Sequence, residues 1–201
     1  MPVGLIPISA HPKTIAVDLD DTLNDFSITL QQGEFPYEPS ASLSEETFQQ
    51  YLELIRGGQT EPSDFMSTGF NYCRFKIHLQ CWQQAHARPD GVRFMQWLRA
   101  NGWRIVICTR RDMRLAYDCT RSWLEENAIP YDYLFTTANK IAFCWAWGIA
   151  HLVDDTDFNI IHGKNYNINV YYPILPQHDS LPAHQASGFR TFDEVQQWIQ
   201  E

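Results

Sequence analysis

The stretch TIAVDLDDTL, residues 14–23, decides the fold of this chain. Its first four residues are mostly apolar or β-branched, which is typical of a buried strand, and Asp18, Asp20 and Asp21 follow directly. In parallel sheets, ligands bind where such strands open into polar loops. We therefore expect residues 14–17 to form a strand with the aspartates at its carboxyl end.

Two segments further along the chain repeat this pattern of an apolar strand that ends at a polar residue. Residues 103–108 run into Thr109, and residues 151–153 run into Asp154 and Asp155. The other predicted elements are strands over 133–135 and 168–172, helices beginning near 89, 112, 138 and 192, and a surface loop over 173–188. Strands that alternate with helices of about ten to fifteen residues predict βαβ units. The predicted fold class is α/β, a Rossmann-like three-layer structure with a parallel sheet.

Residues 24–88 interrupt this alternation. They lack a β-rich strand and show amphipathic helical patterns around 44–55 and 70–87. We therefore expect a small helical cap inserted after the first strand, and an α/β core made of residues 1–23 and 89–201.

Composition and charge narrow the function classes. The 201 residues carry 15 Lys and Arg against 24 Asp and Glu, and the formal charge of −9 disfavours broad nucleic-acid binding. Five cysteines without a C-x-x-C pair favour reduced thiols and a cytoplasmic location. The first residues lack the pattern of a signal peptide, and no apolar run approaches the ~18 residues of a membrane span. A homodimer is compatible with this sequence.

The polar residues at the strand ends are expected to converge, because the carboxyl ends of parallel strands share one edge of the sheet. Four carboxylates in one cleft, Asp18, Asp20, Asp154 and Asp155, would repel one another unless a cation were present. Ligation by oxygen alone suits Mg²⁺, which shares its remaining positions with waters and a substrate phosphate. Lys140 could supply a positive charge for that phosphate.

Each of these residues also has an ordinary structural interpretation. An Asp-x-Asp after a strand is most often a turn, Asp154 and Asp155 could cap a helix, and Lys140 could lie on the surface. What favours a functional site is that all of them occur in order at the ends of consecutive elements.

Together these segments resemble the motifs of the haloacid dehalogenase superfamily of phosphohydrolases. The first motif, an apolar strand followed by Asp-x-Asp-x-Thr, is similar to IAVDLDDTL; the second is similar to RIVICTR, the third to Lys140 and the fourth to HLVDD. The resemblance implies Mg²⁺ as cofactor and a small phosphate ester as substrate. It implies that Asp18 is the nucleophile and that Asp20 is the general acid and base. Thr109 and Lys140 would orient the phosphate, and the metal ligands would be Asp18, Asp20, Asp154 and Asp155.

Within that superfamily the chain is similar to the 5′(3′)-deoxyribonucleotidases. The similarity lies in the length of the insertion and in DLDDTLNDF, where Phe26 falls on an aromatic position that the family uses to stack on the nucleobase. It implies a nucleoside monophosphate as substrate and an aspartyl-phosphate intermediate. The chain departs from that family in Asp21, where Gly is usual, and in Arg110 and Arg111, which follow Thr109.

Some assignments stay open. Arg110, with Arg111, could extend the phosphate site, and Arg74, Lys76 and Trp82 could join Phe26 in holding a base and sugar, or could simply pack the cap. A phosphatase of another small phosphate, or of polynucleotide 3′ ends, is an alternative function, because related end-repair enzymes carry Arg after the second motif. A catalytically silent binding protein with the same fold is a second alternative.

Overall fold

The computed structural model describes residues 12–39, 43–57 and 68–200, and it contains a six-stranded sheet in which every pairing is parallel. The strand order is β3-β2-β1-β4-β5-β6, so the direction of winding reverses at β1. This confirms the predicted parallel α/β sheet, and it places the strand with the aspartates at the switch point. The strands are β1 (Thr14–Val17), β2 (Arg104–Thr109), β3 (Tyr133–Thr136), β4 (His151–Val153), β5 (Asn169–Pro173) and β6 (Ser187–Phe189).

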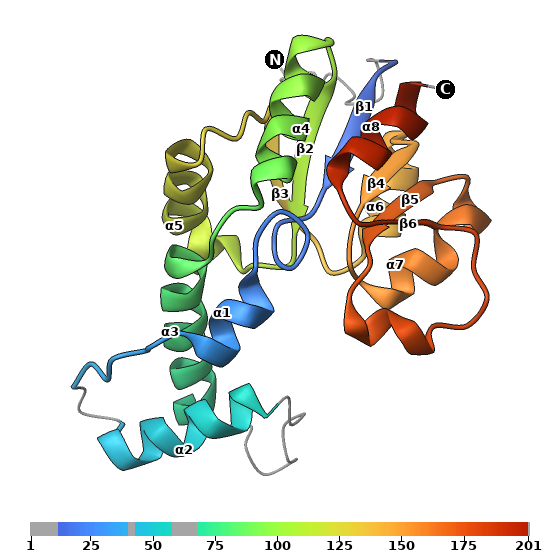
Figure 1. Ribbon diagram of the computed structural model, residues 1–201. Coiled ribbons are helices and arrows are strands. Elements are labelled where there is room, and N and C mark those ends of the chain that lie inside the picture. The colour runs from blue at the N-terminus through green and yellow to red at the C-terminus, as the bar shows by residue number, and fades with distance from the viewer. Residues whose placement is uncertain (1–11, 40–42, 58–67, 201) are drawn as a thin grey trace, which may run out of the picture.

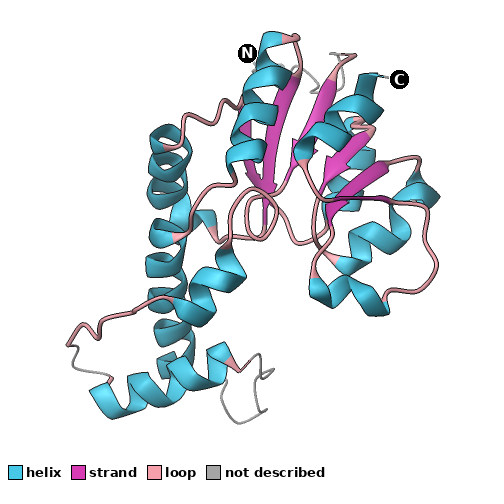
Figure 2. Ribbon diagram, viewed as in Figure 1, coloured by secondary structure: helices cyan, strands magenta, loops and turns pink. Residues whose placement is uncertain are grey.

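Helices cover both faces of the sheet, which gives three layers (Figure 2). Successive side chains of a strand point to opposite faces, so Ile15 and Val17 pack on one side of β1 and Ala16 on the other. The first face is covered by α4 (Pro89–Ala100), α5 (Met113–Glu126) and α8 (Phe192–Gln200), and the second by α6 (Lys140–Trp147) and α7 (Asp157–His162).

Three helices between β1 and β2 form the inserted cap: α1 (Phe26–Gln32), α2 (Glu45–Arg56) and α3 (Thr68–Gln84). Figure 1 shows them grouped beyond the carboxyl ends of the strands. They bury their own apolar cluster, which includes Phe48, Leu52 and Ile77. The two connections between cap and core are joined by an isolated antiparallel bridge between Asn24 and Ala87. The division of the chain at residues 24 and 88 stays a prediction, and residues 1–11 of the predicted core lie outside the described residues.

The structure also contains short elements that the sequence patterns did not indicate. The predicted loop over 173–188 contains a 3-10 helix, η4 (Pro176–Ser180), and runs into β6, so treating it as loop alone was wrong. Strand β6 has only three residues, SGF. Helices α1 and α7 have seven and six residues, and the 3-10 helix η3 (Gly163–Tyr166) has four. Such lengths give too few residues for a period to show. None of the described helices is long and apolar enough to cross a membrane.

Candidate active site

The loops after β1 and β4 bring three carboxylates together. Asp18 continues β1 and is held by a backbone hydrogen bond from its N–H to the carbonyl of Val153 (2.9 Å). Asp154 follows β4 and is fully buried, and Asp155 comes next. Each of the three aspartates offers a carboxylate oxygen, and these oxygens lie within 4.8 Å of one another. The predicted convergence of Asp18 with Asp154 and Asp155 is therefore present in the structure.

Lys140 lies inside this carboxylate cluster and has only 1% of its surface exposed. Its ammonium group donates to Oδ2 of Asp18 (2.7 Å) and to Oδ2 of Asp154 (2.5 Å). The lysine begins α6, where the side chain of Asn139 caps the helix by accepting from the N–H of Ala142 (2.9 Å). Burial alone would lower the pKa of Lys140, but attraction to Asp18 and Asp154 outweighs burial and raises it, so the side chain stays charged.

Two carboxylates of the cluster, those of Asp18 and Asp155, have a raised pKa and hold protons more strongly than ordinary aspartates do. Burial is the largest cause that raises the pKa of Asp18 to about 7; Lys140 opposes the shift, and repulsion from Asp154 and Asp20 adds to it. Burial, followed by repulsion from Asp18 and Asp154, also raises the pKa of Asp155 well above its ordinary value. One ammonium group therefore does not offset the negative charge gathered here.

Asp154 is fixed by more hydrogen bonds than its neighbours in the cluster. Its Oδ1 accepts from the backbone N–H of Thr156 (2.8 Å) and from the side-chain amide of Asn159 (3.0 Å), while its Oδ2 faces Lys140. Asp155, in contrast, is partly exposed. Sequence reasoning missed Asn159 because α7, the helix that carries it, was not predicted.

The donor set of the cluster fits a small divalent cation. Asp18, Asp154 and Asp155 offer oxygen atoms only, and oxygen ligands with a surplus of negative charge are what Mg²⁺ selects. The raised pKa of Asp18 indicates the same need for positive charge, since a bound cation would favour the ionised carboxylate.

Asp20 does not join this cluster through its side chain. Its carboxylate forms a bidentate ion pair with Arg111, whose Nη2 lies 2.5 Å from Oδ1 and whose Nε lies 3.1 Å from Oδ2. Trp82 Nε1 donates to Oδ2 (3.1 Å) and Asn24 Nδ2 to Oδ1 (3.2 Å). The carboxylate predicted to ligate the metal is thus directed to the cap and to the loop after β2.

The loop after β2 places two adjacent arginines in different environments. Thr109 ends the strand with 1% of its surface exposed, and its hydroxyl accepts from the N–H of Arg111 (3.3 Å). Arg110, the predicted phosphate-binding arginine, is exposed and borders a cavity, whereas Arg111 is buried. Sequence reasoning did not identify the burial of Arg111 or its pairing with Asp20.

A cavity of about 610 Å³ lies beside Asp20, between cap helix α3 and the start of α5. Its wall combines residues with rings, among them Phe26, His78 and Trp82, with three arginines, Arg74, Arg110 and Arg111. The ring centroid of Phe26 is 5.4 Å from that of His78 and 6.4 Å from that of Trp82. Lys76, another predicted candidate, is instead paired with Glu38 (3.0 Å) and does not border this cavity.

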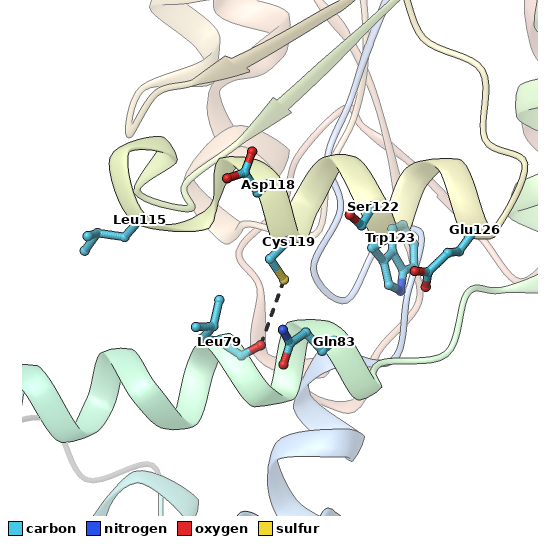
Figure 3. Close-up of a pocket in the computed structure, with 8 residues that line it drawn as sticks. All are labelled: Leu79, Gln83, Leu115, Asp118, Cys119, Ser122, Trp123 and Glu126. Carbon is cyan, nitrogen blue, oxygen red and sulfur yellow. Dashed lines mark hydrogen bonds between the residues drawn. The ribbon is translucent and has the colours of Figure 1, made fainter. Parts of the chain in front are cut away.

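Helix α3 of the cap lies against core helix α5, and the two leave a second hollow of about 520 Å³ between them (Figure 3). Leu79 and Gln83 come from α3, and Asp118 and Cys119 are among the residues from α5. The thiol of Cys119 donates to the carbonyl of Leu79 at 4.0 Å, the dashed line in Figure 3. The cap therefore touches the core at α5 as well as at the two connections.

Comparison with known proteins gives structural likeness only. No family model matches the chain, and no curated protein matches its sequence. A haloacid dehalogenase-like hydrolase from Streptococcus pneumoniae superposes with a TM-score of 0.61 at 16% identity, covering 93% of this chain and 98% of that one. The hydrolase YfnB from Bacillus subtilis, solved with magnesium, superposes with a TM-score of 0.59 at 12% identity, and the match covers 94% of this chain and 99% of that one. A predicted phosphoglycolate phosphatase from Haemophilus somnus superposes with a TM-score of 0.56 at 13% identity, covering 93% of this chain and 97% of that one.

Proposed function

We propose that this chain, which has the fold of the haloacid dehalogenase-like hydrolases, is a Mg²⁺-dependent phosphomonoester hydrolase that acts through an aspartyl-phosphate intermediate. The observation that carries the proposal is the position of Asp18. It lies at the carboxyl end of a central strand, 2.7 Å from the ammonium group of Lys140 and in one cluster with Asp154 and Asp155. This arrangement offers a nucleophilic oxygen next to fixed positive charge and candidate metal ligands.

In the first step, a carboxylate oxygen of Asp18 attacks phosphorus in line with the leaving ester oxygen. The new bond joins Asp18 to phosphorus, the ester bond breaks, and Asp20 gives its proton to the departing oxygen. Lys140 and the hydroxyl of Thr109 stabilise the charge that spreads over the phosphoryl oxygens. Mg²⁺ held by Asp18, Asp154 and Asp155 would supply further neutralisation of that charge.

In the second step, water attacks phosphorus in the aspartyl-phosphate. Asp20, which is now ionised, takes a proton from that water, and the bond between phosphorus and Asp18 breaks. Inorganic phosphate leaves, Asp18 is regenerated as a carboxylate and Asp20 again carries a proton. A single side chain thus serves as acid and then as base, which is why the position of Asp20 matters to both steps.

The cavity between cap and core supports the finer proposal that the substrate is a nucleoside monophosphate, and the enzyme a 5′(3′)-nucleotidase. Phe26 and Trp82 offer ring surfaces on which a planar base can stack, and Arg110 lies at the same cavity to contact phosphate or sugar oxygens. The cavity adjoins Asp20, the proposed acid and base, so a base held there leaves its phosphate on the side of that carboxylate.

The test is phosphate release from nucleoside monophosphates, sugar phosphates and 3′-phosphorylated oligonucleotides, each with Mg²⁺ and with EDTA. We expect Mg²⁺-dependent release that is fastest for nucleoside monophosphates, and none from Asp18→Asn. A preference for sugar phosphates or for oligonucleotide ends would keep the phosphatase and overturn the nucleotidase assignment. Absence of release from all substrates would favour a binding protein.

A further inference from the structure

The carboxylate of Asp20 accepts four hydrogen bonds from three side chains. Arg111 contributes Nε and Nη2, Trp82 contributes its indole N–H and Asn24 its side-chain amide, and each oxygen of Asp20 accepts two of these bonds. A bidentate pair fixes the plane of the carboxylate as well as its position. The orientation of Asp20 is therefore set chiefly by Arg111.

Arg111 is itself fixed on every side. Its side chain has no exposed surface, and Nη1 donates to the hydroxyl of Thr120 on α5 (3.1 Å). The backbone on either side of its Cα is held as well: its N–H donates to Thr109 and its carbonyl accepts from Thr136 (2.6 Å). All three guanidinium nitrogens thus donate to protein oxygens, which favours a role toward Asp20 over a role as a phosphate ligand.

Trp82 connects this pair to the cap. The guanidinium carbon of Arg111 lies 5.0 Å from the centroid of the Trp82 ring, within the range of a cation–π contact, and the same indole donates to Asp20. Trp82 belongs to α3, whereas Arg111 belongs to the loop after β2. A shift of α3 would therefore remove one donor from Asp20 and the ring from Arg111.

We propose that Arg111 is a positioning residue that holds Asp20 in the orientation needed for proton transfer, and that Trp82 makes this orientation depend on the docking of α3. The inference rests on the proposed function, since it assigns Arg111 to the acid and base of that reaction. Asp20 also supplies the carboxylate that lies opposite the buried charge of this arginine.

The test compares Arg111→Gln and Arg111→Lys with Arg121→Gln, a control on the exposed side of α5 where the arginine pairs with Glu125. We expect Arg111→Gln to lower kcat by about 10²-fold and to change KM for a small phosphate ester by less than about twofold, as for a misplaced catalytic group. Arg111→Lys keeps the positive charge but cannot donate from two nitrogens to both carboxylate oxygens, so it should recover only part of the lost kcat. Arg121→Gln should match the wild type.

The phosphorylated protein separates positioning from a merely structural role. Since Asp20 is the base of the second step, Arg111→Gln should let the aspartyl-phosphate accumulate during turnover, which intact-protein mass spectrometry after acid quenching measures. Trp82→Phe keeps the ring and loses the donor, and it should accumulate less of this adduct. No adduct together with unchanged kcat in soluble, folded Arg111→Lys and Trp82→Phe would overturn the proposal.

A double-mutant cycle on melting temperature tests the pairing without any activity. Asp20→Asn, Arg111→Gln and the double variant should not be additive, because each single change leaves the partner buried and unpaired. Additive shifts in an active enzyme would overturn the pairing and leave the proposed function intact. An inactive wild type with non-additive shifts would overturn the proposed function, and the positioning role with it, but not the ion pair.

Discussion

Lys140 donates from Nζ to Oδ2 of Asp18 across 2.7 Å, and both residues are almost fully buried. The same ammonium group contacts Asp154, so one cation of the protein is shared between two carboxylates of the proposed metal site. Removing one partner of a buried pair leaves an uncompensated charge and costs about 3–5 kcal/mol. Lys140 therefore supports the folded state of the site before any metal binds.

Replacing Asp18 or Asp20, which follow β1, should affect the two proposed chemical steps differently. We expect Asp18→Asn to abolish turnover by removing the nucleophile. Asp20→Asn should slow turnover and let the phosphorylated protein accumulate, because the second step then lacks its base. Intact-protein mass spectrometry after acid quenching measures this adduct. Near-normal activity of Asp18→Asn would show that another group attacks phosphorus.

Phe26→Ala should separate nucleotides from simple esters. If the Phe26 ring holds the base, kcat/KM for a nucleoside monophosphate should fall by about 10-fold or more, since a stacking contact contributes about 1–3 kcal/mol. A small generic phosphate ester should lose much less. Phe158→Ala, which removes a half-exposed ring on α7, is the matched control. Equal losses on both substrates would make Phe26 a packing residue.

Asp155→Asn should stabilise the metal-free protein. Burial and repulsion from Asp18 and Asp154 disfavour its charge, so removing that charge should raise the melting temperature in EDTA. At a hundredfold excess over Kd, Mg²⁺ should stabilise the wild type by about 2.7 kcal/mol, or about 5–10 °C, and this gain should shrink in the variant.

Two variants serve as comparisons in those melts. Asp154→Asn should lower the melting temperature instead, because Asp154 accepts hydrogen bonds from Lys140, Thr156 and Asn159. Asp118→Asn, on an exposed part of α5, should behave as wild type. Identical wild-type melts in EDTA and in Mg²⁺ would contradict a shared cation site.

Affinity for Mg²⁺ should fall at acidic pH. The pKa of Asp18 is raised to about 7, so below pH 7 the folded, metal-free protein holds a proton that Mg²⁺ must displace. With one proton displaced, the apparent Kd should rise about tenfold for each pH unit below 7 and level off above it. Isothermal titration in buffers of different ionisation enthalpy at pH 6 and pH 8 measures both affinity and proton release. Proton release that is equal at the two pH values would contradict this prediction.

His78 should make the cap less stable at acidic pH. Burial lowers the pKa of His78 to about 4, with help from Arg74 and Arg111 and against the attraction of Asp20. The unfolded chain therefore binds this proton from about pH 6.5 downward, while the folded protein binds it only near pH 4. Stability should decline across that window by about 3 kcal/mol at most. His78→Asn should flatten the decline relative to the wild type, whereas His86→Asn, at an exposed side chain, should not.

The strands and the motif residues could be predicted because each is encoded locally. Apolar runs marked β1, β2 and β4, and the polar residue after each run marked the edge where the site forms. The reason why Asp21 can stand where the similar family usually has glycine, in contrast, is visible only in the structure. Its backbone has the left-handed conformation (φ 57°) that suits glycine, and its carboxylate accepts from the N–H and hydroxyl of Ser27 at the start of α1.

The pair between Arg111 and Asp20 could not be predicted in the same way. Arg110 and Arg111 are adjacent and chemically alike, and the partners that distinguish them, Trp82 and Thr120, come from two different helices. The sequence spacing gave one signal for this pair. Arg111 is two residues beyond Thr109, as Asp20 is two residues beyond Asp18. In an extended backbone, residues two apart lie on the same side, so Arg111 and Asp20 would both extend beyond the strand ends on the side of Thr109 and Asp18.

The bridge between Asn24 and Ala87 has a consequence for how such a protein can diversify. Since the chain leaves and rejoins the sheet at neighbouring points, the helices between them amount to one long closed loop on the α/β core. Doubling the length of a loop costs only about 0.6 kcal/mol in closure entropy. Segments of other lengths and compositions could therefore be exchanged at this junction with little thermodynamic penalty. Recognition of new substrates could then arise by replacement of the insertion, provided that the new segment supplies a donor to Asp20 in place of Trp82.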